Sequence, residues 1–355
     1  MNPPAAFRAV SILAFACLAA GRPAGAADDP VPPTYRPMPV AAPSAGAPYL
    51  LPDGSIHVIG NDLVDGLFAR FNEIYTKAHP GFRFSMQMPG SPAGIPGIIS
   101  RKSAFAPMGR EAVVQELAGF KARFGYEPTD FQIGYDQSPN PDIFPPAKTP
   151  SAIWISVKNP LPKLTVEQAA RVFTTGGGAG DITHWSQLGL GGEWATREIH
   201  VYLPANRDAV FLFSAEDRFG GRPWTRRAEW LPGVRNVMAA VAQDPFGIGL
   251  IGYWPPDYGW DRQGELQAQL KIVAMGESED GHFSHAGLGD RYPLAGGIHI
   301  YVDRAPGKQM EPWLADYIRL ALSKEGQAII ASMTGSDGFI PLEPEKIAPQ
   351  LAKLK

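Results

Sequence analysis

The protein is a chain of 355 residues, of which 45% are hydrophobic and 19% charged, with a net charge of −3. This length exceeds what one hydrophobic core usually holds and favours two lobes of ordinary domain size. The negative charge argues against nucleic acid or an anionic membrane as a partner. The only cysteine, Cys17, lies near the N-terminus, which excludes a stabilising disulfide, a zinc–thiolate site and a cysteine nucleophile from the rest of the chain.

The first 26 residues have the layout of a secretory signal peptide. Arg8 precedes an apolar stretch over residues 9–20, and Ala24-Gly25-Ala26 supplies small residues for cleavage. The stretch is shorter than the ~20 residues of a membrane-spanning helix, and Cys17 lacks the Leu-rich box of a lipid anchor. We therefore expect a soluble, exported mature chain, whose net charge changes from −3 to −5 when Arg8 and Arg22 are removed.

Residues 27–54 are rich in proline among small residues, which favours an extended leader that buries little surface. Regular structure is predicted to begin with a buried strand from Ser55 to Gly60. Apolar residues then recur every three or four positions from Asn61 to His79, which predicts an amphipathic helix. A strand over 82–86 follows, and Ser91 is placed to cap the next helix, with Pro92 at its first position.

The middle and the end of the chain continue the alternation of strands and helices that is typical of an α/β protein. Thr165 and Gln168 form a capping-box pattern, which predicts a helix through Phe173. One long helix is predicted over 313–333. Further strands are predicted over residues 152–157, 199–203, 248–253 and 298–302.

Five segments, in their order and spacing, resemble the phosphate-binding proteins of ABC importers. The resemblance covers most of the chain after the leader. The segments are Asn159-Pro160-Leu161 followed by Leu164-Thr165 and Phe173, residues 181–189, residues 247–253, Tyr292-Pro293-Leu294, and residues 323–327 through 338–342.

The resemblance implies an α/β fold of the two-lobed periplasmic binding protein type II, with mixed sheets flanked by helices and a hinge between the lobes. Residues 50–137 and 288–355 would form the first lobe, and residues 138–287 the second. A small anion would be held between the lobes. The resemblance implies no catalytic step, no cofactor and no metal.

Two helix starts in the first lobe fit an anion site, because unpaired backbone N–H groups there attract negative charge. At one of them the family has a threonine and an aromatic residue, where this chain has Asp62 and Leu63, and a carboxylate would repel phosphate. At the other the family's glycine and serine are kept as Gly90-Ser91. Asp62 and Ser91 have a second interpretation, as helix caps.

Two charged family positions are changed. The family aspartate that accepts the proton of phosphate falls near Gly109, so that acceptor is absent, and Arg110 lies beside the gap. The family arginine position, within residues 202–209, is apolar. Arg207 could grip an oxyanion bidentately instead, or form a surface ion pair with Asp208. The candidate ligand residues are Asn61, Asp62, Ser91, Arg110, Asn206 and Arg207.

The function expected from these features is capture of phosphate or a related small polar solute in the periplasm, for the membrane subunits of an ABC importer. A zwitterion is an open alternative, as is a degenerate member acting as a sensor or protein-interaction module, with a Trp-rich insertion near 218–232. His282-x-x-His285 is interpreted as a polar loop before a metal site. Neither a nucleotide P-loop nor a Gly-x-Ser-x-Gly nucleophile motif occurs, which leaves an enzyme unsupported.

Overall fold

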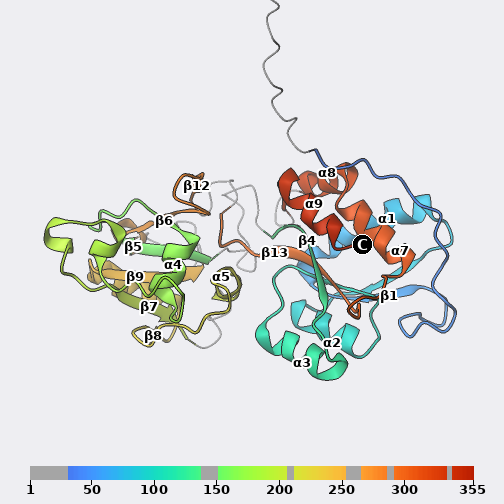
Figure 1. The fold of residues 1–355 in the computed structure, drawn as a ribbon, viewed down its shortest axis with the longest axis horizontal. Coiled ribbons are helices and arrows are strands. Elements are labelled where there is room, and N and C mark those ends of the chain that lie inside the picture. Colours follow the sequence, from blue (N-terminus) through green and yellow to red (C-terminus); the bar gives the residue numbers. More distant parts are fainter. Residues whose placement is uncertain (1–30, 137–150, 206–211, 253–264, 286–291, 334–337) are drawn as a thin grey trace, which may run out of the picture. The chain divides into compact units, whose positions relative to one another are not determined.

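The computed structural model describes residues 31–136, 151–205, 212–252, 265–285, 292–333 and 338–355 (Figure 1). The predicted signal peptide, residues 1–26, lies outside the described residues, as do Asn206 and Arg207. The described chain is a mixed α/β protein, as the sequence predicts, and its buried side chains form two large hydrophobic cores. Within the described residues, no helix combines the length and the apolar character needed to cross a membrane.

The first core contains a mixed set of short strands covered by helices (Figure 1). One sheet has the antiparallel order β14-β4-β13-β3, and β1 pairs in parallel with β2. The strands are β1 (Ile56–Ile59), β2 (Phe84–Gln87), β3 (Ala106–Met108), β4 (Thr129–Tyr135), β13 (Gly297–Val302) and β14 (Ile340–Pro341). The helices are α1 (Asp65–Ala78), α2 (Gly94–Ile99), α3 (Val114–Phe124), α7 (Pro312–Ala321), α8 (Lys324–Ser332) and α9 (Pro344–Ala352).

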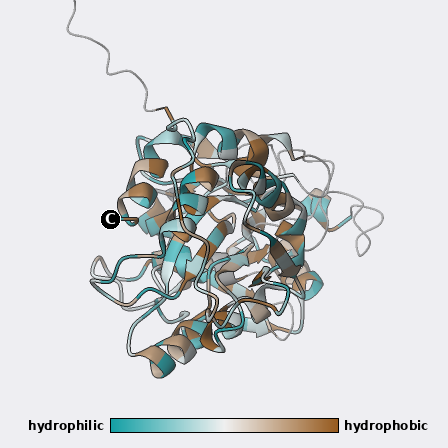
Figure 2. Ribbon diagram, turned by 90° about the vertical axis from the view of Figure 1, so that its right-hand side faces the viewer, coloured by the Kyte–Doolittle hydropathy of each residue, from teal (hydrophilic) through white to brown (hydrophobic). Residues whose placement is uncertain are grey.

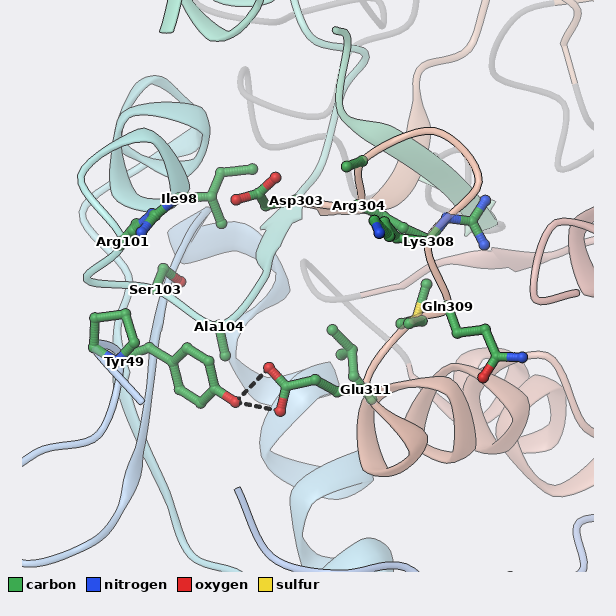
Figure 3. A pocket seen from close by; sticks show the side chains of 14 residues that line it. Tyr49, Ile98, Arg101, Ser103, Ala104, Asp303, Arg304, Lys308, Gln309 and Glu311 are labelled. Atoms are coloured by element: carbon green, nitrogen blue, oxygen red, sulfur yellow. Dashed lines mark hydrogen bonds between the residues drawn. The ribbon is translucent and has the colours of Figure 1, made fainter. Parts of the chain in front are cut away.

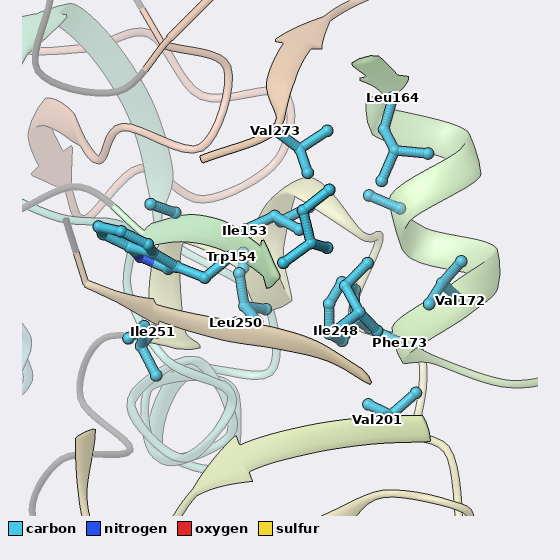
Figure 4. Close-up of a cluster of buried hydrophobic side chains, with 14 of the residues drawn as sticks. Ile153, Trp154, Leu164, Val172, Phe173, Val201, Ile248, Leu250, Ile251 and Val273 are labelled. Carbon is cyan, nitrogen blue, oxygen red and sulfur yellow. The ribbon is translucent and has the colours of Figure 1, made fainter. Parts of the chain in front are cut away.

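The second core is built on a five-stranded sheet of order β10-β5-β9-β7-β8. Every residue of β5 (Ser151–Ser156) and β9 (Gly247–Gly252) is buried, which explains why both read as continuous rather than alternating apolar runs. Ile153 and Ile248 lie in one cluster with Phe173 of α4 (Figure 4). The remaining elements are β6 (Lys163–Thr165), β7 (His200–Pro204), β8 (Glu229–Leu231), β10 (Leu270–Ile272), β11 (Ala274–Gly276), β12 (Phe283–Ser284), α4 (Val166–Phe173), α5 (Phe213–Arg218) and α6 (Val234–Gln243).

Among the described residues, the chain changes from one core to the other at two points. Tyr135 packs in the first core and Ala152 in the second; later, Leu294 packs in the second and Ile298 in the first. Leu294 belongs to the segment 288–355 that the sequence analysis assigns to the first lobe. The lobe boundaries 50–137 with 288–355, and 138–287, remain a proposal.

The described part of the predicted leader, from residue 31, contains no helix, and it packs against the first core more than expected. Tyr35 packs against the first core, and its hydroxyl donates to Asp316 at 2.8 Å. The Tyr35 backbone N–H donates to Glu325 at 2.6 Å, and the Lys324 N–H donates to the carbonyl of Pro33 at 2.8 Å. Tyr35, an aromatic residue between the prolines, therefore ties this part of the leader to the first core.

The prediction of one long helix over 313–333 is wrong, because two helices replace it. α7 ends at Ala321 and α8 begins at Lys324, with Ser323 as the N-cap whose hydroxyl accepts from the Gly326 N–H at 3.1 Å. The helices remain amphipathic on both sides of this break, and Figure 2 shows helices with hydrophobic residues on one side and hydrophilic residues on another. A capping serine inside an apolar pattern therefore ended one helix and began the next.

The predicted capping box at the start of α4 is confirmed. The Thr165 hydroxyl accepts from the Gln168 N–H at 3.1 Å, and the Gln168 side chain accepts from the Thr165 N–H at 2.9 Å. We expect Thr165→Ala to lower the free energy of unfolding by about 1 kcal/mol, because it leaves helix-end N–H groups unsatisfied. Urea denaturation measures this change. Thr76→Ala, inside α1, is the control and should be neutral or slightly stabilising; an equal loss in both variants would contradict the cap's role.

Candidate functional site

The end of β1 lies directly against β3. The Asn61 backbone N–H donates to the Pro107 carbonyl at 2.9 Å. A side chain on Gly60 would collide with Pro107, since a Cβ there would lie 2.7 Å from the Pro107 Cδ. Glycine at position 60 therefore allows the two backbone segments to approach and brings Asn61 next to the loop around Gly109.

Asn61 connects the starts of two helical segments. Its side-chain oxygen accepts from the Leu63 N–H at 2.6 Å, which caps the 3₁₀ turn η1 (Asp62–Val64) in front of α1. Its side-chain nitrogen donates to the Ser91 hydroxyl, and both residues are buried. Asp62 is therefore not the cap, as one interpretation of the sequence had it; it is the first residue of the turn, and it is exposed.

Ser91 is also not a helix cap. It is the first residue of the 3₁₀ turn η2 (Ser91–Ala93), whose cap position is Gly90, with a φ of 127°. This left-handed backbone favours glycine, and the Gly90 N–H donates to the Gly60 carbonyl at 3.1 Å. The Ser91 hydroxyl is instead joined to Asn61, so Gly60-Asn61 and Gly90-Ser91 form one buried polar cluster.

Asp136 completes this cluster and is not among the residues predicted from the sequence. It directly follows β4, it is only 7% exposed, and its N–H donates to the Gly296 carbonyl at 2.9 Å. A Cβ built on Gly109 would lie 2.7 Å from the Asp136 carboxylate and 3.5 Å from the Asn61 side-chain nitrogen. An acidic residue at the end of the buried strand segment Ile133-Gly134-Tyr135 was the signal that could have identified it.

Arg110 adjoins the cluster, but its guanidinium contacts the start of α3. Two of its nitrogens donate to the Glu116 carboxylate at 2.8 and 2.9 Å, and one also donates to the Glu111 carbonyl at 2.7 Å. Glu116 in turn accepts from the Val113 N–H at 2.9 Å. The arginine therefore joins the site loop to the α3 N-terminus, and a direct contact between Arg110 and a ligand remains a prediction.

Comparison with known proteins decides the family. Residues 47–325 match the family model described as the PBP superfamily domain. The chain belongs to this superfamily. It is 27% identical over 307 residues to the phosphate-binding protein PstS of Pseudomonas aeruginosa, covering 84% of this chain and 86% of that protein, which confirms the resemblance predicted from the sequence.

Solved structures similar to this PBP-superfamily chain include two phosphate proteins. The ABC-type phosphate transport receptor of Vibrio cholerae is 16% identical, with a TM-score of 0.42, covering 81% of this chain and 100% of that structure. PstS of Borrelia burgdorferi is 14% identical, also with a TM-score of 0.42, covering 80% and 97% respectively.

Other features predicted from the sequence of this PBP-superfamily chain lie away from the polar cluster or outside the described residues. Asn206 and Arg207 lie outside the described residues. In the Trp-rich insertion, Arg227 donates to the carbonyls of Ile199 and Ile182 at 3.3 and 3.1 Å, so this arginine ties backbone segments of the second core together. Within the described part of the chain, no three His, Cys, Asp or Glu side chains come together in a group suited to a metal.

A cavity of about 300 Å³ lies elsewhere on the first core of this PBP protein (Figure 3). The leader forms one wall, where the Tyr49 hydroxyl donates to the Glu311 carboxylate at 2.6 and 2.8 Å. Arg101 and Lys308 are among the charged residues that line it. None of the candidate ligand residues lines this cavity, so it is separate from the polar cluster around Asn61.

Proposed function

We propose that this protein is a periplasmic solute-binding protein that captures phosphate or a related small oxyanion and delivers it to the membrane subunits of an ABC importer. The observation that carries the proposal is the buried contact between Asn61 and Ser91, which joins the turn before α1 to the turn that begins at Ser91. Backbone N–H groups at the start of a helix such as α1 favour a bound anion without a buried counter-ion.

The relative named a phosphate-binding protein supports the choice of ligand. We propose that the solute lies between lobe 1, residues 50–137 with 288–355, and lobe 2, residues 138–287, and that the lobes close over it by hinge motion. Asn206 and Arg207 would then reach it from the second lobe. Residues 1–26 would direct export and be removed, and no catalytic step is involved.

The test is the thermal unfolding midpoint of the mature chain with and without phosphate. At a hundredfold excess over the dissociation constant, a ligand that binds only the folded state stabilises it by about 2.7 kcal/mol. We expect Ser91→Ala to remove most of this stabilisation, because the serine hydroxyl belongs to the proposed site.

Ser103→Ala is the matched control. Ser103 is also buried in the first core, and its hydroxyl accepts from the Ile59 N–H at 2.8 Å, but it lies outside the polar cluster. This variant should unfold at a lower temperature and keep the full phosphate shift. If the wild-type chain shows no shift with phosphate, sulfate, phosphonates or amino acids, the transport proposal is wrong and an interaction module replaces it.

A further inference from the structure

We propose that the cavity between the leader and the first core is a second ligand site, which binds a small organic anion: a carboxylate with an apolar body. The cavity lies apart from the polar cluster around Asn61 and Ser91, so the inference goes beyond the proposed capture of an oxyanion. Its volume of about 300 Å³ falls at the lower end of the range of small-molecule sites. About ten water-sized groups fill such a volume.

Three segments that are far apart in the sequence form the walls of this cavity (Figure 3). They are the leader at Pro48-Tyr49, the end of α2 within residues 98–104, and the connection from β13 to α7 within residues 303–314. The Tyr49 hydroxyl donates to Glu311, which directly precedes α7. This hydrogen bond fixes the leader wall against the rest of the site.

Part of the lining is apolar. Ile98, Ala104 and Leu314 are buried residues of the first lobe's hydrophobic clusters, and Met310 packs against the first core. A hydrocarbon chain or ring that lies on these side chains is removed from water, which favours binding, whereas a mineral oxyanion gains nothing from such a surface. Methionine also adapts its shape to irregular ligands. The apolar lining therefore favours an organic ligand over phosphate or sulfate.

The carboxylates of the lining are already engaged by neutral donors. Glu311 accepts from the Tyr49 hydroxyl at 2.6 and 2.8 Å and from the Trp313 Nε1 at 2.8 Å. Asp303 accepts from the Tyr126 hydroxyl at 2.6 Å. These hydrogen bonds occupy acceptor positions that a cationic ligand would need, so the site is less suited to a cation.

The cations of the lining retain donors for a ligand. Arg101 and Lys308 lie on opposite sides of the cavity in the view of Figure 3. Among the described residues, neither forms an ion pair. A third cation, Arg304, donates to the Lys353 carbonyl. A guanidinium can grip a carboxylate through two parallel hydrogen bonds, so Arg101 is the stronger candidate to bind the charged end of the ligand.

The backbone of Arg101 supports a use for its side chain. Its φ is 59°, in the left-handed region, and it is the only residue other than glycine with a positive φ in the described part of the chain. Its N–H donates to the Ile98 carbonyl at 2.9 Å, where α2 ends. Glycine adopts this conformation without the clash that a Cβ introduces. An arginine in such a position points to a function of the guanidinium.

Calorimetry with octanoate tests the proposal, because this carboxylate has an apolar chain and about ten non-hydrogen atoms. 1-Octanol, which has the same chain without the charge, is the neutral comparison. The mature chain is used with its leader intact, in millimolar phosphate so that the site proposed for oxyanions is occupied. We expect octanoate to bind at least about tenfold more tightly than 1-octanol, because hydrogen bonds between charged groups are the stronger ones.

Arg101→Gly should lower the affinity for octanoate about tenfold, and Lys308→Ala should lower it in the same direction. The thermal unfolding midpoint of Arg101→Gly should be unchanged or higher, since glycine suits a φ of 59°. Arg123→Ala is the matched control: the Arg123 guanidinium lies 5.1 Å from the centre of the Phe124 ring, where Arg101 lies at 5.8 Å, but Arg123 does not line the cavity. This variant should bind octanoate as the wild type does.

The inference is overturned if octanoate does not bind at millimolar concentration, or binds no more tightly than 1-octanol. It is also overturned if Arg101→Gly keeps the wild-type affinity, or if Arg123→Ala loses as much affinity as Arg101→Gly. Octanoate binding that depends on Arg101, in a chain that shows no stabilisation by phosphate, would support this site and contradict only the proposed function.

Discussion

Replacing His299 with alanine is expected to lower the free energy of unfolding by about 3–5 kcal/mol, because it leaves a buried carboxylate without its partner. His299 is 4% exposed on β13, and its Nδ1 lies 2.7 Å from Asp130. Its Nε2 lies 3.5 Å from the buried Glu111. Glu111 also accepts from the Gly297 N–H at 3.0 Å, so the loss would reach the start of β13.

Urea denaturation of His299→Ala beside His200→Ala isolates the effect of burial. His200 also pairs with an aspartate, Asp244, at 2.6 Å, but its side chain is 51% exposed. Solvent screens such a surface pair, and its loss should cost no more than about 1 kcal/mol. Equal losses in the two variants would show that the buried cluster around His299 contributes nothing special.

The dependence of stability on pH provides an independent readout of the same residue. Burial lowers the pKa of His299, but the negative charges of Asp130 and Glu111 raise it by a larger amount. The net result is a pKa of about 10, against 6.5 for a free histidine. The folded state therefore binds the proton more tightly than the unfolded state. The stabilisation is complete below pH 6.5 and is lost as the pH rises toward about 10. His299→Gln should abolish this part of the decline; an unchanged profile would contradict a protonated His299.

Replacing Gly326 with alanine is the second large expected loss, of about 3 kcal/mol, through overpacking. Gly326 lies in the first turn of α8, where its Cα faces the end of α7. A Cβ would collide with the Leu320 carbonyl and lie 2.6 Å from the Ala321 carbonyl. Backbone atoms cannot rotate away as a flexible side chain can, so α7 and α8 would have to separate.

Gly119→Ala is the matched control for this substitution, because Gly119 also lies inside a helix, α3. The nearest atom to its Cβ position is the Ile99 Cδ1 at 3.8 Å, an ordinary contact. Alanine there should stabilise the protein by about 0.5–1 kcal/mol, because it is the better helix former. Chemical denaturation compares the two variants, and stabilisation in both would show that α7 and α8 have room to adjust.

The local elements were predictable wherever the sequence has a clear period or a complete cap. The apolar spacing from Asn61 to His79 gave α1, and Thr165 with Gln168 gave the start of α4. The break at Ser323 was missed because apolar residues continue through it at helical spacing. In the folded chain the interruption is marked by the Ser323 cap and by the close approach of Gly326 to the end of α7.

The candidate site was predictable only in part. Ser91 and Asn61 come together as neighbours of two helical turns, and a family pattern can indicate such positions. The position of Asp136 beside Gly109 could not be predicted from the sequence. Gly109 follows β3 and Asp136 follows β4, and the two residues meet only in the folded chain. The contact between Arg110 and Glu116 likewise depends on the direction in which α3 leaves the loop.

The way in which the first core is assembled has a consequence for the order of folding. Its members come from both ends of the chain: Phe68 and Phe131 pack in the same cluster as Tyr317 and Ile347, and Pro33 is tied to Lys324. Contacts between such distant segments form slowly, because a long loop must close first. The second core, built from a continuous middle stretch, can form while the C-terminal helices are still being synthesised. The first core cannot be completed until almost the last residues are available, because Ile347 is part of it. The part of the protein that carries Asn61 and Asp136 therefore completes its folding last.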